Sequence, residues 1–251
     1  MKEKSGHYKN ITKVYLILQL LLYVSFLYID MVKKTSYDLS ADLKFAGIIL
    51  CFFYTLILSG YQWNKIDVSL LKLALFFTLI SDYFILMLDI YLPGVLTFCA
   101  VQSIYLIRLG FWRKQEDLAL QQNRALRHMI AKKFARNIII SFFLILCIYF
   151  FMGIDVLTGV VCFYFVSLLC NTVDSVILAM KHGIKYEVWY ALGMVLFMLC
   201  DINVGIFNLS DYIAVSSYWY KSLYNFAAVA MWLFYLPAQV LITLSGQTLD
   251  K

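Results

Sequence analysis

Two aspartates lie inside long apolar stretches, where a carboxylate is energetically costly. Asp82 follows Phe76–Ser81, and Asp201 follows Leu196–Cys200. An aspartate near the middle of a membrane-spanning helix costs about 2.5–3.5 kcal/mol on insertion scales, so each is a candidate functional residue. Two carboxyl groups at one depth can perform acid–base chemistry, in which one holds a proton while the other is ionised. The alternative for each is a buried structural hydrogen bond.

Other polar side chains in apolar stretches could complete such a site. They are Ser81, Gln102, Tyr105, Asn171, Asp174, Asn208 and Gln239. Gln102 and Tyr105 are three positions apart, as are Asn171 and Asp174, so each pair shares a helix face. Pro237 in the last apolar stretch frees a backbone carbonyl and can bend a helix beside a cavity. Hydrogen bonds that only hold helices together are the alternative for the amides.

The composition describes a membrane protein. Of the 251 residues, 63% are hydrophobic and only 14% are charged, with a mean hydropathy of +0.80. A soluble domain is about half apolar and a quarter charged, so a water-soluble enzyme is excluded. The 18% aromatic content opposes intrinsic disorder.

Eight apolar runs are long enough, or nearly long enough, to cross a bilayer. They cover about 14–32, 43–60, 69–88, 91–112, 137–153, 156–180, 187–207 and 222–245. Barrel strands would alternate apolar and polar residues, and Ile138–Phe151 does not. We therefore expect an all-α polytopic membrane protein of about eight transmembrane helices, forming one transmembrane domain over 1–251.

The basic residues predict the orientation of these helices. With eight spans, 17 of the 21 Lys and Arg residues fall on the side that carries the N-terminus. Cytoplasmic loops carry such an excess, so we expect both termini in the cytoplasm. The first run is too long for a signal peptide and no small-residue cleavage site follows it. The absence of targeting signals points to a bacterial plasma membrane.

The chain divides into helices 1–4 over 1–112, a basic cytoplasmic loop over 113–136, and helices 5–8 over 137–251. The loop is either a solvated connector or an amphipathic helix on the anionic inner leaflet. Asp82 and Asp201 lie in the third and seventh helices, which run in the same direction. Seven residues later come Asp89 and Asn208, and this matched spacing is consistent with two parallel four-helix repeats.

Several classes of site have no sequence signature here. The chain contains no nucleophile elbow, phosphate-binding glycine loop or zinc-protease motif. The six cysteines lack the spacing of a metal site or a disulfide framework. We therefore expect no cofactor and no metal. The net charge of +6 reflects the one-sided Lys and Arg residues, so we expect no nucleic-acid partner.

A series of short motifs runs through both halves of the chain. In order, they are Ser81-Asp82, Leu92-Pro93-Gly94, Phe98, Gln102-Ser103-Ile104-Tyr105, Gly193, Phe197, Cys200-Asp201 and Tyr235–Gln239. This series resembles the YhhN family of integral membrane proteins, whose characterised members are lysoplasmalogenases. The resemblance is strongest over 72–105 and 193–245. Two positions depart from the family pattern: Ser81 replaces a glycine, and Gln102 replaces a histidine that could relay protons near neutral pH.

The resemblance implies hydrolysis of the vinyl ether bond of a lysoplasmalogen, a lysophospholipid of the membrane. Asp82 and Asp201 would be the catalytic residues, sharing a proton as a coupled pair. The supporting residues would be Ser81, Gln102, Tyr105, Asn208 and Gln239. Two alternatives stay open: a proton-coupled carrier with matched acids in repeated halves, and a non-catalytic lipid-binding member that has lost the histidine. The oligomeric state is left open.

Overall fold

The computed structural model describes residues 2–33, 37–58, 65–114, 122–152, 155–211 and 218–247. Its elements, in chain order, are α1 (Lys2–Tyr28), η1 (Ile29–Lys33), α2 (Tyr37–Leu58), α3 (Lys65–Asp82), η3 (Tyr83–Met87), α4 (Tyr91–Lys114), α5 (Gln122–Met152), α6 (Val156–His182), α7 (Lys185–Phe207), η4 (Leu209–Asp211) and α8 (Tyr218–Leu244). These ranges contain no strand. Eight helices have the length and apolar character to cross a membrane, so the chain is an integral membrane protein. The predicted all-α fold is confirmed.

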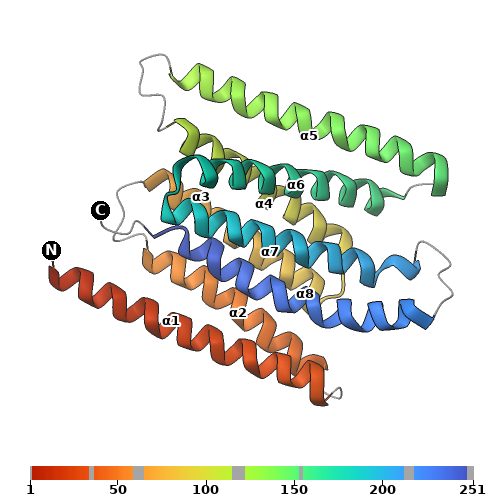
Figure 1. The fold of residues 1–251 in the computed structure, drawn as a ribbon, viewed down its shortest axis with the longest axis horizontal. Coiled ribbons are helices and arrows are strands. Elements are labelled where there is room, and N and C mark those ends of the chain that lie inside the picture. Colours follow the sequence, from red (N-terminus) through yellow and green to blue (C-terminus); the bar gives the residue numbers. More distant parts are fainter. Residues whose placement is uncertain are drawn as a thin grey trace.

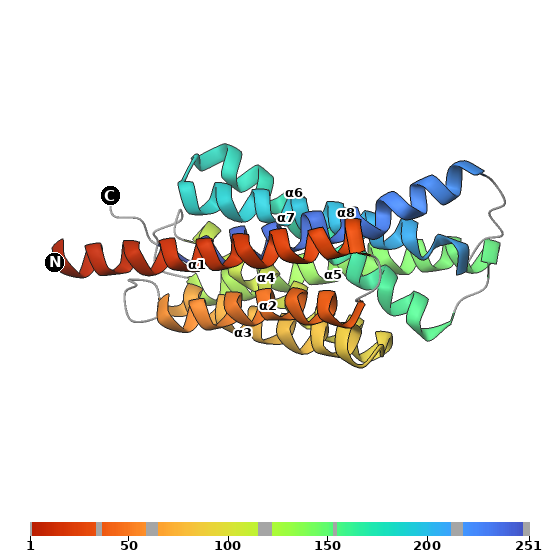
Figure 2. The same cartoon turned by 90° about the horizontal axis from the view of Figure 1, so that it is seen from below.

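The helices pack side by side, and successive helices reverse direction (Figure 1). Both chain ends lie at the same end of the bundle, which we call the proximal end; the opposite end is the distal end (Figures 1 and 2). The helices α3 and α7 both run from the proximal to the distal end. The prediction that the two aspartate-bearing helices are parallel is therefore confirmed.

The eight helices are buried to very different extents. The α4 span is 56% buried, whereas the α5 span is 11% buried and lies at one edge of the bundle (Figure 1). Large apolar side chains of α5 point outward, among them Phe142, Phe143 and Phe150. Lipid tails are the solvent for such a face, so its exposure carries no penalty in a bilayer.

Helix contacts follow the same plan in both halves of the chain. The α3 helix packs along α4 as α7 packs along α8. The α4 helix also contacts α6 and α5, and α8 makes the corresponding contacts with α2 and α1. This exchange of partners between the halves is the pattern expected of two four-helix repeats related by an approximate twofold axis.

The boundaries of α6 follow from local sequence. Asp155 is the N-cap, and its carboxylate accepts a hydrogen bond of 2.8 Å from the Thr158 backbone amide. Gly183 ends the helix in the left-handed conformation, with a φ of 64°, and its amide donates to the Ala179 carbonyl. A residue without a side chain adopts this conformation without strain.

Both α1 and α3 end at the distal end in a π-helical turn. These turns are Ile29–Lys33 and Tyr83–Met87, and the second begins directly after Asp82. Asp89, two residues beyond it, has a positive φ of 55°. Such π-helical turns are rare and are frequently found at functional sites.

The basic segment expected as a loop over 113–136 is helical from Gln122 onward. There it forms the first part of α5, where Ile130 and Met129 pack against α4 at Gly110. Met129 and Ile130, two apolar residues of the expected surface helix, therefore face a neighbouring helix of the bundle. Leu118, another apolar residue of the same segment, lies outside the described residues.

A buried ion pair joins three helices at the proximal end. The Arg108 side chain of α4 donates two hydrogen bonds to Asp67 of α3, at 2.8 and 3.1 Å. It also donates to Ser245, directly after α8, at 2.9 Å from Nη1 to Oγ. The Trp112 indole donates to the same aspartate at 2.7 Å. Arg108 is fully buried, so these partners replace the water that its charge has lost.

Candidate active site

The two aspartates lie at matched depths on parallel helices. Asp82 is the last residue of α3 before its π-helical turn, and Asp201 lies in the second half of α7. Each is about one and a half turns from the distal end of its helical run. Asp82 is buried, Asp201 is partly buried, and their carboxyl groups are close enough to interact electrostatically. The two acidic side chains therefore lie on parallel helices at the same level of the bundle.

Each aspartate has a tyrosine from another helix beside it. The Tyr235 hydroxyl of α8 donates a hydrogen bond of 2.7 Å to Asp82 Oδ2. The Tyr164 side chain of α6 lies beside Asp201. Asp201 Oδ2 has no hydrogen-bond partner among the described residues. Each carboxyl group thus has a phenol next to it, and Asp201 keeps one oxygen available for another molecule.

Aromatic rings connect the two tyrosines. The Phe98 ring lies 5.6 Å from the Tyr164 ring and 5.9 Å from the Phe197 ring, measured between centroids. The Phe197 ring in turn lies 5.5 Å from that of Tyr235. These four rings form what we call the aromatic wall. The faces of aromatic rings attract cations, so this wall can stabilise positive charge that develops beside the carboxylates.

A charged pair lies near the aromatic wall toward the distal end. Lys44 Nζ is 2.8 Å from Asp30 Oδ2 and 4.9 Å from the centroid of the Trp232 ring. The Trp232 ring packs edge-on against Tyr235 at 5.2 Å. This pair was not among the predicted site residues, although a Lys inside the second apolar run and an Asp near the end of the first were visible signals in the sequence.

Ser81 holds two helices together. Its hydroxyl donates to the Gly94 carbonyl near the start of α4, with an O–O distance of 2.5 Å. Gly94 allows this close approach, because a Cβ there would lie 2.5 Å from Cγ1 of Ile85. Ser81 therefore fixes the end of α3 that carries Asp82, and it acts on the site through the position of that helix.

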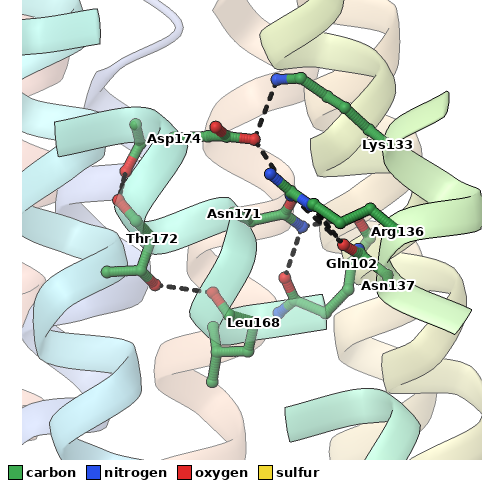
Figure 3. A network of polar contacts seen from close by, with 9 residues as sticks. Gln102, Lys133, Arg136, Asn137, Leu168, Asn171, Thr172 and Asp174 are labelled. Atoms are coloured by element: carbon green, nitrogen blue, oxygen red, sulfur yellow. Dashed lines mark hydrogen bonds and ion pairs between the residues drawn. The ribbon is translucent and has the colours of Figure 1, made fainter. Parts of the chain in front are cut away.

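Gln102 belongs to a different polar network from the aspartates. The Asn171 side-chain amide of α6 donates to the Gln102 backbone carbonyl at 2.8 Å and to its Oε1 at 3.0 Å (Figure 3). No hydrogen bond or ion pair within the described part of the chain joins Gln102 to either aspartate. The predicted grouping of Gln102 with the aspartates is therefore not what the structure gives. The Gln102 side chain is directed toward α6, where an amide partner is available.

Asp174 is likewise separate from the aspartate pair. It accepts from Lys133 Nζ at 2.9 Å and from Arg136 Nη2 at 3.3 Å, both of α5 (Figure 3). These ion pairs attach the edge helix α5 to α6. The first part of α5 is helical where a loop was expected. Its basic residues Lys133 and Arg136 therefore bind Asp174, which was a candidate for the active site.

The remaining predicted residues have distinct positions. The Asn208 side-chain amide caps α7, donating to the Val204 carbonyl at 2.9 Å. Tyr105 is fully buried, with its ring 5.6 Å from that of Tyr190. Gln239 is fully buried on α8, one turn beyond Tyr235. Neither the Tyr105 hydroxyl nor the Gln239 amide has a hydrogen-bond partner among the described residues.

The site's chemistry is that of carboxyl groups and phenols. Within the described residues, no group of three His, Cys, Asp or Glu side chains is placed to hold a metal ion. Two adjacent carboxyl groups can donate and accept protons, and their phenol neighbours can stabilise whichever group is ionised.

Comparisons with protein-family models, with curated proteins and with solved structures find no match for this chain.

Proposed function

We propose that the protein is a membrane-embedded hydrolase that cleaves the vinyl ether bond of a lysoplasmalogen-type lysophospholipid. The observation that carries this proposal is that Asp82 and Asp201 lie at the same level on two parallel helices, beside an aromatic wall. The resemblance to the YhhN family supplies the substrate class. Its two motif acids are the same two residues that are paired here.

The reaction needs proton transfer, stabilisation of a cation and activation of water. One protonated aspartate transfers its proton to the vinyl carbon that is not bonded to oxygen, and the carbon bonded to oxygen becomes an oxocarbenium ion. The ionised partner and the faces of Phe98 and Phe197 stabilise that cation. Water then adds to the cation and gives its proton to a carboxylate. The resulting hemiacetal collapses into a fatty aldehyde and the free hydroxyl of the glycerophospho-headgroup, so one water is consumed and no net proton.

The Lys44–Asp30 pair suits the headgroup of such a lipid. A phosphodiester needs a cation near it, and an ammonium headgroup needs an anion or an aromatic face. Lys44, Asp30 and the Trp232 ring offer these groups within a short distance of Tyr235. A lipid bound with its headgroup there would place its ether bond on the side of the aspartates.

We place the protein in a bacterial plasma membrane, with both termini in the cytoplasm. The support is the excess of Lys and Arg on the side of the termini, which is typical of cytoplasmic loops. In this orientation the proximal end faces the cytoplasm, and the aspartates lie nearer the outer face.

The test is aldehyde release from a lysoplasmalogen by the purified protein in detergent. We expect release by the wild type, and its loss in both Asp82→Asn and Asp201→Asn. Asp42→Asn, which changes an exposed carboxylate of α2, is the matched control and should keep full activity. No release from a folded wild type over a range of pH and headgroups would overturn the proposal.

A proton-coupled carrier is the second candidate, and the repeated helix contacts of the two halves favour it. Matched acids in repeated halves are common in transporters. A carrier would show pH-driven solute flux in liposomes that Asp82→Asn abolishes, with no aldehyde release.

A non-catalytic lipid-binding protein is the third candidate, which the placement of Gln102 outside the site favours. Such a protein would bind lysolipid equally well with either aspartate replaced.

A further inference from the structure

Polar side chains form a stripe along one face of α8. Tyr235, Gln239 and Thr243 are spaced four residues apart, so they lie above one another on the same side of the helix. Tyr235 binds Asp82, and Thr243 lies beside Tyr15 of α1 and Cys51 of α2. The stripe therefore runs from the candidate active site toward the proximal end.

Buried polar groups of four other helices lie next to this stripe or next to one another. On α1 and α2, the Gln19 amide donates to the Gly47 carbonyl at 2.9 Å and to Cys51 Sγ at 3.2 Å, and Tyr15 is also 3.2 Å from that sulfur. On α3 and α4, Thr78 lies beside Tyr105. Together we call these residues the polar column: Tyr15, Gln19, Cys51, Thr78, Tyr105, Tyr235, Gln239 and Thr243.

The column continues to the proximal end of the bundle. The Tyr54 ring stacks on Tyr15 with centroids 4.0 Å apart. The Tyr54 hydroxyl is 2.7 Å from Thr12 Oγ1 and accepts a hydrogen bond of 2.6 Å from Gln247, just beyond α8. Polar groups therefore follow one another from Asp82 to the end of the bundle where both termini lie.

Five polar atoms of the column have no hydrogen-bond partner among the described residues. They are Gln19 Oε1, Tyr105 Oη, Gln239 Oε1, Gln239 Nε2 and Thr243 Oγ1. Their residues are all at most 4% exposed. Leaving one buried polar group unsatisfied costs about 1–3 kcal/mol, so five in one column require partners. Buried groups of this kind are ordinarily satisfied by internal water.

The side chains of the column are better suited to bind water than to bind an ion. Its groups are neutral amides, hydroxyls and a thiol, which both donate and accept hydrogen bonds. Among the described residues, Asp82 is the only charged side chain that hydrogen-bonds to a member of the column. A permeating ion would lack counter-charges along this path, whereas water matches donors and acceptors alike.

We propose that the polar column holds a file of internal water that connects the proximal end of the bundle with Asp82. The file would deliver the water that hydrolysis consumes, while the lipid chain approaches from the bilayer. This use of the water rests on the proposed hydrolase function; the presence of the water does not.

X-ray radiolysis with mass spectrometry tests the column directly, because radicals from bound water modify the side chains next to it. On the full-length protein in detergent, we expect modification of Tyr105 and Cys51 despite their burial. Label from ¹⁸O-water should appear at both after brief mixing. The matched control is Met194, a reactive and fully buried side chain of α7 outside the column, which should stay unmodified.

Two variants then remove the polar groups while keeping their shape. Gln239→Leu and Thr243→Val should lower the modification of Cys51 and Tyr105 to the level of Met194. Wild-type protein in which Cys51 and Tyr105 react no faster than Met194 would overturn the water file, whether or not the variants fold. A labelled column in a protein without aldehyde release would uphold the water file and overturn the hydrolase.

Discussion

The Tyr235 hydroxyl reaches Asp82 across 153 positions of sequence and donates to it at 2.7 Å. This bond ties the last helix to the third at the point where α3 changes from α- to π-helical geometry. It fixes the orientation of the carboxyl group, and it supplies the hydrogen bond that stabilises its ionised form.

Tyr235→Phe should therefore weaken both stability and turnover. A hydrogen bond to a charged group contributes about 1.5–3 kcal/mol, so loss of this one should slow aldehyde release about tenfold or more. The measurement is kcat with a lysoplasmalogen, alongside the thermal midpoint in detergent. Tyr224→Phe on the same helix, whose ring stacks on Phe207, is the control. An unchanged kcat would show that Tyr235 does not act on the reacting carboxyl group.

Lys44→Met tests the role of the charged pair in binding the headgroup. Loss of the cation should raise KM for a phosphate-bearing lysolipid about tenfold, as expected for one charge-assisted bond, and leave kcat nearly unchanged. The exposed Lys221, at the same end of the bundle, provides the control Lys221→Met. If kcat fell while KM stayed constant, the pair would act on the geometry of the site.

Arg108→Met should be strongly destabilising. It leaves Asp67 buried beside Trp112 without its guanidinium, and breaking a buried ion pair costs about 3–5 kcal/mol. The free energy of unfolding in mixed detergent micelles is the measurement. Arg127→Met on the exposed face of α5 should change it little. Equal losses in the two variants would contradict a special role for the proximal ion pair.

The tight packing of α7 against α8 at Gly193 leaves no room for a side chain there. A Cβ there would lie 2.8 Å from Ile242 Cγ1 and 3.0 Å from the Ala238 carbonyl. Gly193→Ala should cost about 1–3 kcal/mol through overpacking. In contrast, Gly205 of the same helix has open space around it. Gly205→Ala should be neutral or stabilising by up to about 1 kcal/mol, through its higher helix propensity. Thermal midpoints compare the two.

Asp155 should give the stability a dependence on acid pH. The Thr158 hydroxyl lies beside its carboxylate and the Thr158 backbone amide donates to it, and together they hold the pKa of Asp155 below its ordinary value. Its contribution is present above the pKa of the unfolded chain and is lost as the pH falls through the lower, folded value. Asp155→Asn keeps a capping oxygen that does not titrate. The thermal midpoint of the wild type should therefore fall more on acidification than that of the variant.

The fold followed closely from hydrophobicity, and the aspartate pair followed from helix direction. Apolar length identifies a span, and the parity of the spans makes α3 and α7 parallel. Depth then follows from position along each helix, which brought Asp82 and Asp201 to the same level. These inferences need only the position of a residue along its helix axis, and that position can be counted from the sequence.

Rotation about each helix axis could not be obtained in the same way. Gln102 lies at a plausible depth for the site, yet its side chain turns toward Asn171. Tyr164 was one of 19 tyrosines, with nothing in the pattern to mark it as a neighbour of Asp201, and Tyr235 was visible only as the first residue of the Tyr235–Gln239 motif. A displacement of one residue rotates a side chain by about 100°, so the choice of partner depends on packing between distant helices.

The Arg108–Asp67 pair shows a second limit. Both residues lie near the ends of apolar runs, where charged side chains ordinarily extend to the lipid headgroups. The two positions are 41 residues apart, and only the packing of α3 against α4 decides that they bind each other.

Because both termini lie at the proximal end, a reporter fused to either one samples the same compartment (Figure 1). Alkaline phosphatase is active only outside the cytoplasm, and green fluorescent protein exported in unfolded form fluoresces only inside it. Complementary fusions at Lys251 would therefore determine the sidedness of the whole molecule in one colony assay. The same result would decide from which side of the membrane a soluble partner could meet the proximal end.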